Sequence, residues 1–388
     1  MAEVHDSSIP ESFWAALRSD PGIQDPFSLF RDLGDVPGCS HAAASLALKD
    51  RRFPVIPPVP LDRPMWRMFN RWLIMRNDPE HAAIRRVIGR AFTRTAVEAY
   101  RPMVEATVDK LLDELTPLGE MEFRRQFAFR LPTAVICELM QLPAEAREGL
   151  DELLDDLDLA FVHQGKEAYV ARGDDAVEVL QQRLESVLRE RSLHPGDDLI
   201  SRLLTVDHDG VGGVVEHEDL VANSVFLLQA GHDTTMNALT SGIYTLLKHP
   251  DQLEHLRKEP GGIPGAVEEM LRYNSPIGVA PRTAREDVEL PQGTVPAGGT
   301  VTFFLGAINR DPDVFAAPDV FDVTRGENPH LAFGAGPHLC AGAPLARLEL
   351  QVALAAILRR LPSLRLVEEP RWTGVAPFRG LDALHVAW

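Results

Sequence analysis

The stretch PHLAFGAGPHLCAGAPLARLEL, residues 329–350, places one cysteine between a glycine-punctuated loop and an apolar helical pattern. Gly334 and Gly336 allow close approach of the backbone and positive φ angles within the loop. The residues after Cys340 predict a helix with Pro344 in its first turn, where a missing N–H group costs nothing. Cys340 should therefore lie at a helix amino terminus, a setting that favours the thiolate.

Three roles are open for Cys340 on this reasoning: a buried structural cysteine, a nucleophile or a metal ligand. A nucleophile needs a base, and His338 is only two residues away, whereas such a base normally comes from elsewhere in the fold. The other two cysteines, Cys39 and Cys137, are distant in sequence. The three therefore form no disulfide framework and no zinc-binding pair, which is typical of a reducing cytoplasm.

The residues around Cys340 resemble the signature of the cytochrome P450 family, in which such a cysteine binds haem iron. FGAGPHLCAG (333–342) has the six fixed residues of that signature in place. AVEEMLRY (266–273) is similar to the family's Glu-x-x-Arg arrangement, and LLQAGHDTT (227–235) to its Ala-Gly-x-(Asp/Glu)-Thr stretch. The order and spacing of the three motifs favour the haem-ligand role.

The resemblance extends along nearly the whole chain. The segments 77–93, 307–325 and 378–388 are similar to the family's helix C, its meander and its carboxyl-terminal hairpin. It implies a mainly α protein, a single P450 haem domain over residues 1–388 with small β-sheets. Hydrophobic spacing by itself predicts helices, strands and one proline-rich loop. The helices are expected at 93–115, 175–192 and 217–249, the strands at 279–284, 300–305 and 364–367, and the loop at 53–66.

The amino-terminal sheet is expected to be reduced. Related proteins usually carry a β-hairpin between the segments that correspond here to 25–33 and 42–53. The connection in this chain is only GDVPGCSH, which is too short for two strands and a turn. The edge of the strand at 300–305 should therefore be bare or covered in another way, and a second subunit could cover it as a dimer.

The resemblance implies a cofactor site for haem b around Cys340. Cys340 would be the thiolate ligand of the iron, held in check by helix N–H groups. The haem propionates would be bound by His81 and Arg85, which share one helix face, and by Arg282 and His338. The loop residues of the site would be Phe333, Gly334, Gly336 and Gly342.

On the opposite side of the haem, the resemblance places Asp233 and Thr234 as the catalytic pair. An acid and a hydroxyl can relay protons to bound O₂. Ala230 and Gly231 would leave room for oxygen in the same helix. Because P450-like peroxygenases usually lack the pair, its presence favours an oxygen-activating enzyme. Glu269 and Arg272 are expected to be structural, tying their helix to the meander and supporting the haem loop.

The function implied by the resemblance is a monooxygenase that inserts one oxygen atom from O₂ into a small organic substrate, in natural-product tailoring by hydroxylation or epoxidation. The alternative is a P450-fold protein for oxidative coupling, rearrangement or recruitment of another enzyme. Substrate contacts are expected from mostly apolar segments, so the substrate should be largely hydrophobic. These segments are 54–72, 160–175, the helix face before Asp233, 274–281 and the region near Phe378.

Electrons should come from NAD(P)H through a ferredoxin reductase and a ferredoxin, because no flavin or iron–sulfur motif is present. Arg86, Arg90 and Arg94 recur every four residues and are either a solvated surface or a docking patch for an acidic ferredoxin. The net charge of −18 argues against nucleic acid as a partner. The absence of a signal-like amino terminus and of a long apolar run favours a cytoplasmic protein without a membrane span.

Overall fold

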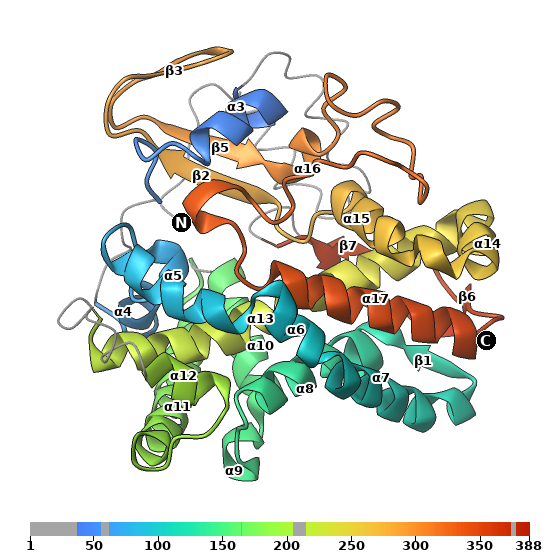
Figure 1. Ribbon diagram of the computed structural model, residues 1–388, viewed down its shortest axis with the longest axis horizontal. Coiled ribbons are helices and arrows are strands. Elements are labelled where there is room, and N and C mark those ends of the chain that lie inside the picture. Colours follow the sequence, from blue (N-terminus) through green and yellow to red (C-terminus); the bar gives the residue numbers. More distant parts are fainter. Residues whose placement is uncertain (1–36, 56–61, 164, 205–214, 374–377) are drawn as a thin grey trace. The chain divides into compact units, whose positions relative to one another are not determined.

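The computed structural model describes residues 37–55, 62–163, 165–204, 215–373 and 378–388 (Figure 1). Contacts divide the chain into two compact units, which are described separately below. The first holds residues 55–100 and 133–232, and the second holds 37–54, 101–132 and 233–388. Among the described residues, no helix is long and apolar enough to cross a membrane. That the chain forms one domain stays a prediction.

The described part of the first unit is helical. The longest helix within this unit, α11, begins at Glu167, so the helix predicted at 175–192 covers only its later part. This helix packs against α10. The proline-rich stretch 53–66 was predicted as a loop, but α4 already begins at Pro64, because proline suits the first turn of a helix. The elements are α4 (Pro64–Phe69), η2 (Leu73–Met75), α5 (Glu80–Ala91), α6 (Arg94–Ala99), α9 (Ala144–Arg147), α10 (Leu150–Val162), α11 (Glu167–Leu193) and α12 (Leu199–Leu204).

Two helices cross the division between the units, α8 (Arg130–Leu139) and α13 (His217–Lys248). The prediction of one long helix over 217–249 is confirmed by α13. The prediction of one helix over 93–115 is wrong, because the chain leaves the helix at Tyr100 and α7 (Arg101–Leu115) begins anew. Pro102 accounts for the break, since it lacks the N–H that would continue the hydrogen bonds of α6.

The second unit combines helices with four small antiparallel sheets. Its core helix α17 packs against α7 and α15. The further helical elements are η1 (Pro37–Cys39), α3 (His41–Ala47), η3 (Thr116–Leu118), η4 (Arg124–Ala128), α14 (Pro250–Lys258), η6 (Pro260–Gly262), α15 (Ile263–Tyr273), α16 (Leu305–Ile308), η7 (Gly336–His338) and α17 (Ala343–Arg360). The mainly α fold with small sheets is therefore confirmed.

The sheets join strands that are far apart in sequence. Their orders are β1-β9-β6, β2-β5, β3-β4 and β7-β8. The strands are β1 (Glu120–Glu122), β2 (Val279–Thr283), β3 (Val288–Leu290), β4 (Gly293–Val295), β5 (Thr300–Phe304), β6 (Arg365–Leu366), β7 (Trp372–Thr373), β8 (Gly380–Leu381) and β9 (His385–Ala387). The predicted strands at 279–284, 300–305 and 364–367 are confirmed by β2, β5 and β6. Figure 1 shows β2 beside β5.

The prediction of a carboxyl-terminal hairpin at 378–388 is wrong. Its two strands do not pair with each other: β8 pairs with β7, whereas β9 pairs with β1 and β6. Asp382 marks the separation, because its carboxylate accepts hydrogen bonds from the N–H groups of Arg371 (3.1 Å) and Ala383 (2.8 Å). These bonds fix a bend between the strands.

The strand β5 is contacted by η1 as well as by its sheet partner. In the described residues, β5 pairs only with β2, and η1 packs against β5. A Cβ atom at Gly38 would lie 2.3 Å from the carbonyl oxygen of Thr302, so the close approach requires glycine. We expected β5 to be bare or covered in a way other than by a hairpin, and its contacts with η1 agree with the second alternative. The segment 25–33 lies outside the described residues. A dimer at this edge stays a prediction.

Candidate functional site

Cys340 lies in a closed loop directly before α17. Its backbone N–H donates to the carbonyl oxygen of Phe333 (2.9 Å), and the N–H of Gly334 donates to Leu331 (2.8 Å). The cysteine is exposed in the described structure, and a Cβ atom at Gly342 would lie 4.0 Å from its sulfur. The thiol therefore lies just before the amino terminus of α17, as predicted, and is accessible to an approaching group.

Gly334 and Gly336 shape this loop. Both have φ angles of +70°, which favour glycine over any other residue. A Cβ atom at Gly336 would also lie 2.3 Å from the carbonyl oxygen of Leu48 in α3's continuation, a contact that no side chain tolerates. His338 ends the short turn η7 and is half-buried. The conformations expected of both glycines are confirmed.

The loop is supported by Glu268, which the sequence analysis did not single out. The Glu268 carboxylate accepts two hydrogen bonds from Arg347 of α17 (both 2.8 Å), and His330 Nε2 lies 3.1 Å from it. The Arg347 guanidinium in turn lies 4.5 Å from the ring centre of Phe333. Burial would raise the pKa of Glu268, but the bonds from His330 and Arg347 outweigh it and lower this pKa to about 2.

Glu269 and Arg272 form the centre of a buried network. Two nitrogens of Arg272 donate to the two carboxylate oxygens of Glu269 (2.7 Å each), and neither side chain is exposed (0 %). Arg272 also donates to the carbonyl oxygens of Asn309 (3.0 Å), Pro318 (2.7 Å) and Val320 (3.0 Å). The expected tie between α15 and the meander is confirmed. Asn328, just before the cysteine loop, also donates to Glu269 (3.1 Å), and the neighbouring Glu268 adds the bonds to Arg347 and His330.

Arg282 is a cation that is largely removed from solvent. It lies on β2, opposite Val301 of β5, and burial lowers its pKa to about 10. Its guanidinium donates to the carbonyl oxygen of Pro281 (2.8 Å), and no carboxylate of the described residues lies within ion-pair distance of it. Because a desolvated charge without a partner is unfavourable, this position suits an anionic group of a ligand.

His81 and Arg85 lie on α5 in the first unit. His81 is buried, and burial lowers the pKa of its imidazole against the opposing effect of Asp78, whose carboxylate is 3.6 Å away. Arg85 is half-buried one turn later. Cys340, His338 and Arg282 belong to the second unit. That all five converge on one cofactor therefore stays a prediction.

Asp233 and Thr234 lie near the middle of α13. Asp233 is buried, and its carboxylate accepts a hydrogen bond from Asn237 Nδ2 (3.1 Å) one turn later. Thr234 is half-buried. Asn237 is a residue that sequence reasoning missed, and its amide oxygen packs against Gly380, where a Cβ atom would lie only 2.1 Å away. The acid is thus oriented by a side chain that is itself held in place.

Aromatic side chains gather in the first unit from three segments expected to contact substrate. Phe161 of α10 lies 4.9 Å from Phe69 and 5.4 Å from Trp72, measured between ring centres. Trp66 and Phe226 extend the group, and Phe226 of α13 lies 5.2 Å from Trp72. Phe69 and Phe226 are partly exposed. These five residues, called here the aromatic cluster, give the first unit an apolar wall.

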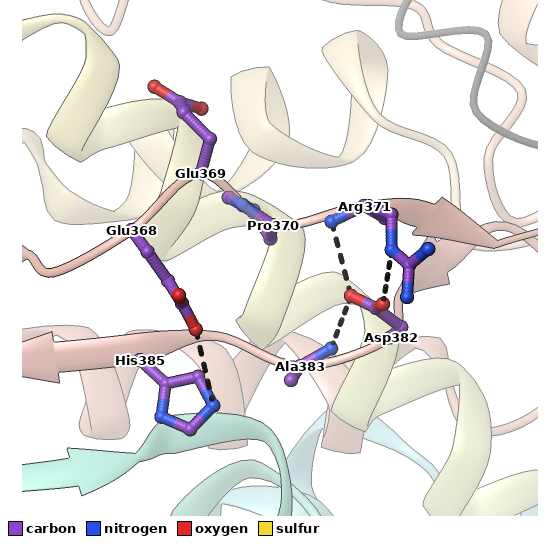
Figure 2. A pocket seen from close by; sticks show the side chains of 7 residues that line it. All are labelled: Glu368, Glu369, Pro370, Arg371, Asp382, Ala383 and His385. Atoms are coloured by element: carbon purple, nitrogen blue, oxygen red, sulfur yellow. Dashed lines mark hydrogen bonds and ion pairs between the residues drawn. The ribbon is translucent and has the colours of Figure 1, made fainter.

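Figure 2 shows a pocket of different character, with a volume of about 310 Å³. Two pairs join side chains of its lining: Arg371 Nε lies 3.3 Å from Asp382, and His385 Nε2 lies 3.7 Å from Glu368. Glu369 pairs instead with Lys248 outside the lining. The lining contains no residue of the predicted site and no aromatic wall. The complete lining is Glu368, Glu369, Pro370, Arg371, Asp382, Ala383 and His385.

Comparison with known proteins places these features in a family. The family model for cytochrome P450 matches residues 147–262 and 263–368. The biotin biosynthesis cytochrome P450 of Bacillus subtilis (strain 168) is 36% identical over 384 residues, 98% of this chain and 96% of that protein. The 6-deoxyerythronolide B hydroxylase of Saccharopolyspora erythraea is 38% identical over 311 residues, 79% of this chain and 76% of that protein. A crystal structure of P450BioI with an acyl carrier protein bearing hexadec-9Z-enoic acid has a TM-score of 0.87 and 34% identity, covering 98% of this chain and 100% of that chain.

Proposed function

The chain belongs to the cytochrome P450 family and is a monooxygenase of that family, and we propose that it inserts one oxygen atom from O₂ into a small, largely hydrophobic substrate. The observation that carries the proposal is that the second unit contains both the exposed Cys340, just before the amino terminus of α17, and the buried Asp233, which is followed by the hydroxyl-bearing Thr234. Relatives named mycinamicin VIII C21 methyl hydroxylase and 6-deoxyerythronolide B hydroxylase support a hydroxylation in natural-product tailoring.

Haem b fits the residues of the second unit. Cys340 would bind its iron, and Arg282 and His338 would bind its propionates, with His81 and Arg85 of the first unit as further partners. The fit is supported by Arg282, whose desolvated charge calls for an anion. The remaining loop positions are Phe333, Gly334, Gly336 and Gly342, with Ala230 on α13. When bound, the haem-thiolate group supplies the activation of O₂.

Asp233 and Thr234 would move protons toward the reaction. Asn237 donates to one carboxylate oxygen of Asp233 (3.1 Å) and so fixes the plane of the carboxyl group. Thr234 follows it directly and, being half-buried, can present its hydroxyl to the reaction space. A proton held on the Asp233 carboxyl can pass to the Thr234 hydroxyl oxygen while the hydroxyl gives up its own.

We expect Thr234→Ala to keep haem and substrate binding but to uncouple the reaction. Reductant would still be consumed, while product per reductant falls by about a factor of ten or more, the range of general acid contributions. The measurement is NAD(P)H consumed, peroxide released and product formed. Thr240→Ala is the control, because the Thr240 hydroxyl donates to the carbonyl oxygen of Met236 in the same helix (2.7 Å). An unchanged yield per reductant in Thr234→Ala would remove Thr234 from the proton path.

The form of the substrate has a second candidate, an acyl chain on a carrier protein. The aromatic cluster supports an apolar substrate in either case. The relative that matches nearly the whole chain is named for biotin biosynthesis, and P450BioI was solved with a fatty acyl carrier protein. Supplying one acyl chain free and carrier-bound separates the candidates: a carrier-bound substrate requires turnover of the second and not of the first.

An acidic ferredoxin is the proposed electron donor. Arg86 and Arg90 of α5 and Arg94 of α6 are all exposed. The expectation of a single helix face for all three is wrong for Arg94, because α5 ends at Ala91 and α6 begins at Arg94. The chain as a whole carries a net charge of −18. The two exposed arginines on one face of α5, with Arg94 at the start of the next helix, therefore stand out from an acidic background. Such a patch accelerates the encounter with an acidic partner.

We expect Arg86→Glu with Arg90→Glu to slow reduction by a ferredoxin about tenfold at low salt while haem content and substrate affinity stay intact. Wild-type reduction should slow as ionic strength rises, and the variant should depend on salt much less, because rim charges act mainly on the encounter rate. The measurement is stopped-flow reduction at several salt concentrations. The matched control reverses Arg189 and Arg365, exposed on α11 and β6, with the same change of net charge. Equal slowing by both variants would contradict a specific docking patch.

A further inference from the structure

A buried polar group in the first unit has no role in the mechanism above. Asp158 of α10 faces Gln229 and His232 of α13: Gln229 Nε2 donates a short hydrogen bond to Asp158, and His232 Nε2 lies 4.0 Å from the other carboxylate oxygen. Gln229 is 4 % exposed and His232 0 %. The Asp158 side chain is 19 % exposed, so solvent or a ligand can still reach its carboxylate.

The amide oxygen of Gln229 is buried and has no hydrogen-bond donor among the described residues. Its orientation is fixed by Asp158, because a flipped amide would set two acceptors against each other. A buried acceptor without a donor is unfavourable. The oxygens of the Asp158 carboxylate beside it are further acceptors. The Gln229 amide oxygen therefore calls for a ligand that donates a hydrogen bond, next to a second acceptor.

The polar group adjoins the aromatic cluster. Asp158 precedes Phe161 by three residues on α10, and Gln229 follows Phe226 by three residues on α13. Residues three apart lie on the same helix face, one turn from each other. Both phenylalanines contact Trp72, at 5.4 Å and 5.2 Å between ring centres. The aromatic cluster is thus bordered by two hydrogen-bond acceptors, the Asp158 carboxylate and the Gln229 amide oxygen.

The charge of α10 favours a cation at this place. Its sequence LDELLDDLDLAFV contains five acidic residues and neither lysine nor arginine. Asp156 pairs with Arg172 of α11, whereas Asp158 faces Gln229 of α13. The Asp158 carboxylate favours a positive group over a carboxylate such as that of a free fatty acid.

We propose that Asp158 and Gln229 form a subsite for a cationic, hydrogen-bond-donating end of the substrate, a guanidinium or a protonated amine, whose apolar body packs on the aromatic cluster. The inference rests on the proposed function and names its substrate class. A guanidinium suits the site best, because its parallel N–H groups can serve a carboxylate and a neighbouring amide oxygen at once.

Three probes with the same twelve-carbon chain test the subsite in the haem-loaded protein by calorimetry. They are dodecylguanidinium, dodecyltrimethylammonium, which has the charge but no N–H group, and dodecanoate. We expect the guanidinium to bind about tenfold or more tightly than the trimethylammonium, as for the loss of charge-assisted hydrogen bonds, and dodecanoate to bind most weakly. Equal affinity for all three probes would overturn the subsite and leave only a water to satisfy Gln229.

Two shape-conserving variants locate the effect. Asp158→Asn should reduce the preference for guanidinium over trimethylammonium to about twofold or less and strengthen dodecanoate binding. Gln229→Leu should weaken only the guanidinium, by about threefold or more. It serves as the test if Asp158→Asn lowers the melting temperature too far. A preference that survives both changes refutes the proposal. The carbon-monoxide spectrum of the same preparations reports thiolate ligation, so failure of the subsite is distinguishable from failure of the proposed function.

Discussion

Replacing Cys340 with serine should abolish the red-shifted thiolate band of the reduced carbon-monoxide complex and, with it, all reductant-coupled product formation. The reason is that a hydroxyl is a poorer donor to iron than a thiolate. The measurement is the reduced carbon-monoxide difference spectrum, together with haem content. Because the loop is closed by the backbone bond from Cys340 N–H to Phe333 (2.9 Å), the substitution leaves the scaffold in place.

Cys137→Ala is the control for Cys340→Ser. Cys137 is buried in α8, and burial raises the pKa of its thiol to about 11, so that it stays protonated at neutral pH. Its replacement should keep the thiolate band. Retention of the band in Cys340→Ser would assign the ligand to another residue. A wild-type protein that takes up no haem would contradict the cofactor assignment as a whole.

Those parts of the site that depend on local backbone chemistry could be predicted from sequence. The φ angles of Gly334 and Gly336, the helix start after Cys340 and the long helix α13 all follow from residues close together in the chain. Turn and capping preferences act over a few residues, and a motif records them directly.

Other parts depend on partners that local sequence does not reveal. Glu268 and Glu269 are adjacent, yet one faces Arg347 and the other Arg272, because successive residues of a helix point in different directions. The pattern AVEEMLRY contained both acids, and only the second belonged to a motif. Asn237 shows the same limit, since its support by Gly380 joins residues that are distant in sequence.

The corrections have a similar origin. Strand-like sequence at 378–388 was correctly located, but hydrogen-bond partners decide the sheet, and β8 and β9 find theirs in β7 and in β1 with β6. Periodicity at 93–115 continued across Pro102 because apolar spacing does not record a missing N–H group. The pattern predicts which face is buried, whereas backbone hydrogen bonding decides where an element ends.

Arg272→Met should lower the free energy of unfolding by about 3–5 kcal/mol, the cost of breaking a buried ion pair by removing one partner. Glu269 would lose both bonds from Arg272 and keep the one from Arg325 Nε (3.0 Å). The carbonyl groups of Asn309 and Pro318 would lose the donor Arg272, whereas that of Val320 keeps a bond from Arg325 (3.1 Å). The measurement is urea unfolding of the haem-loaded protein, with haem release as a second probe.

The control is Glu254→Gln on α14, which removes a surface ion pair with Lys258 (3.3 Å), whose side chains are 52 % and 71 % exposed, and should change stability by less than about 1 kcal/mol. The double variant Glu269→Gln with Arg272→Met tests the cause. If the cost comes from the Glu269 carboxylate, which then keeps only Arg325 as a cationic partner, removing its charge should recover part of the loss in Arg272→Met. A loss below about 1 kcal/mol in Arg272→Met would show that the network does not hold the meander. A loss that the double variant does not recover would instead attribute the cost to the carbonyl groups of Asn309 and Pro318, which lose the donor Arg272 in both variants.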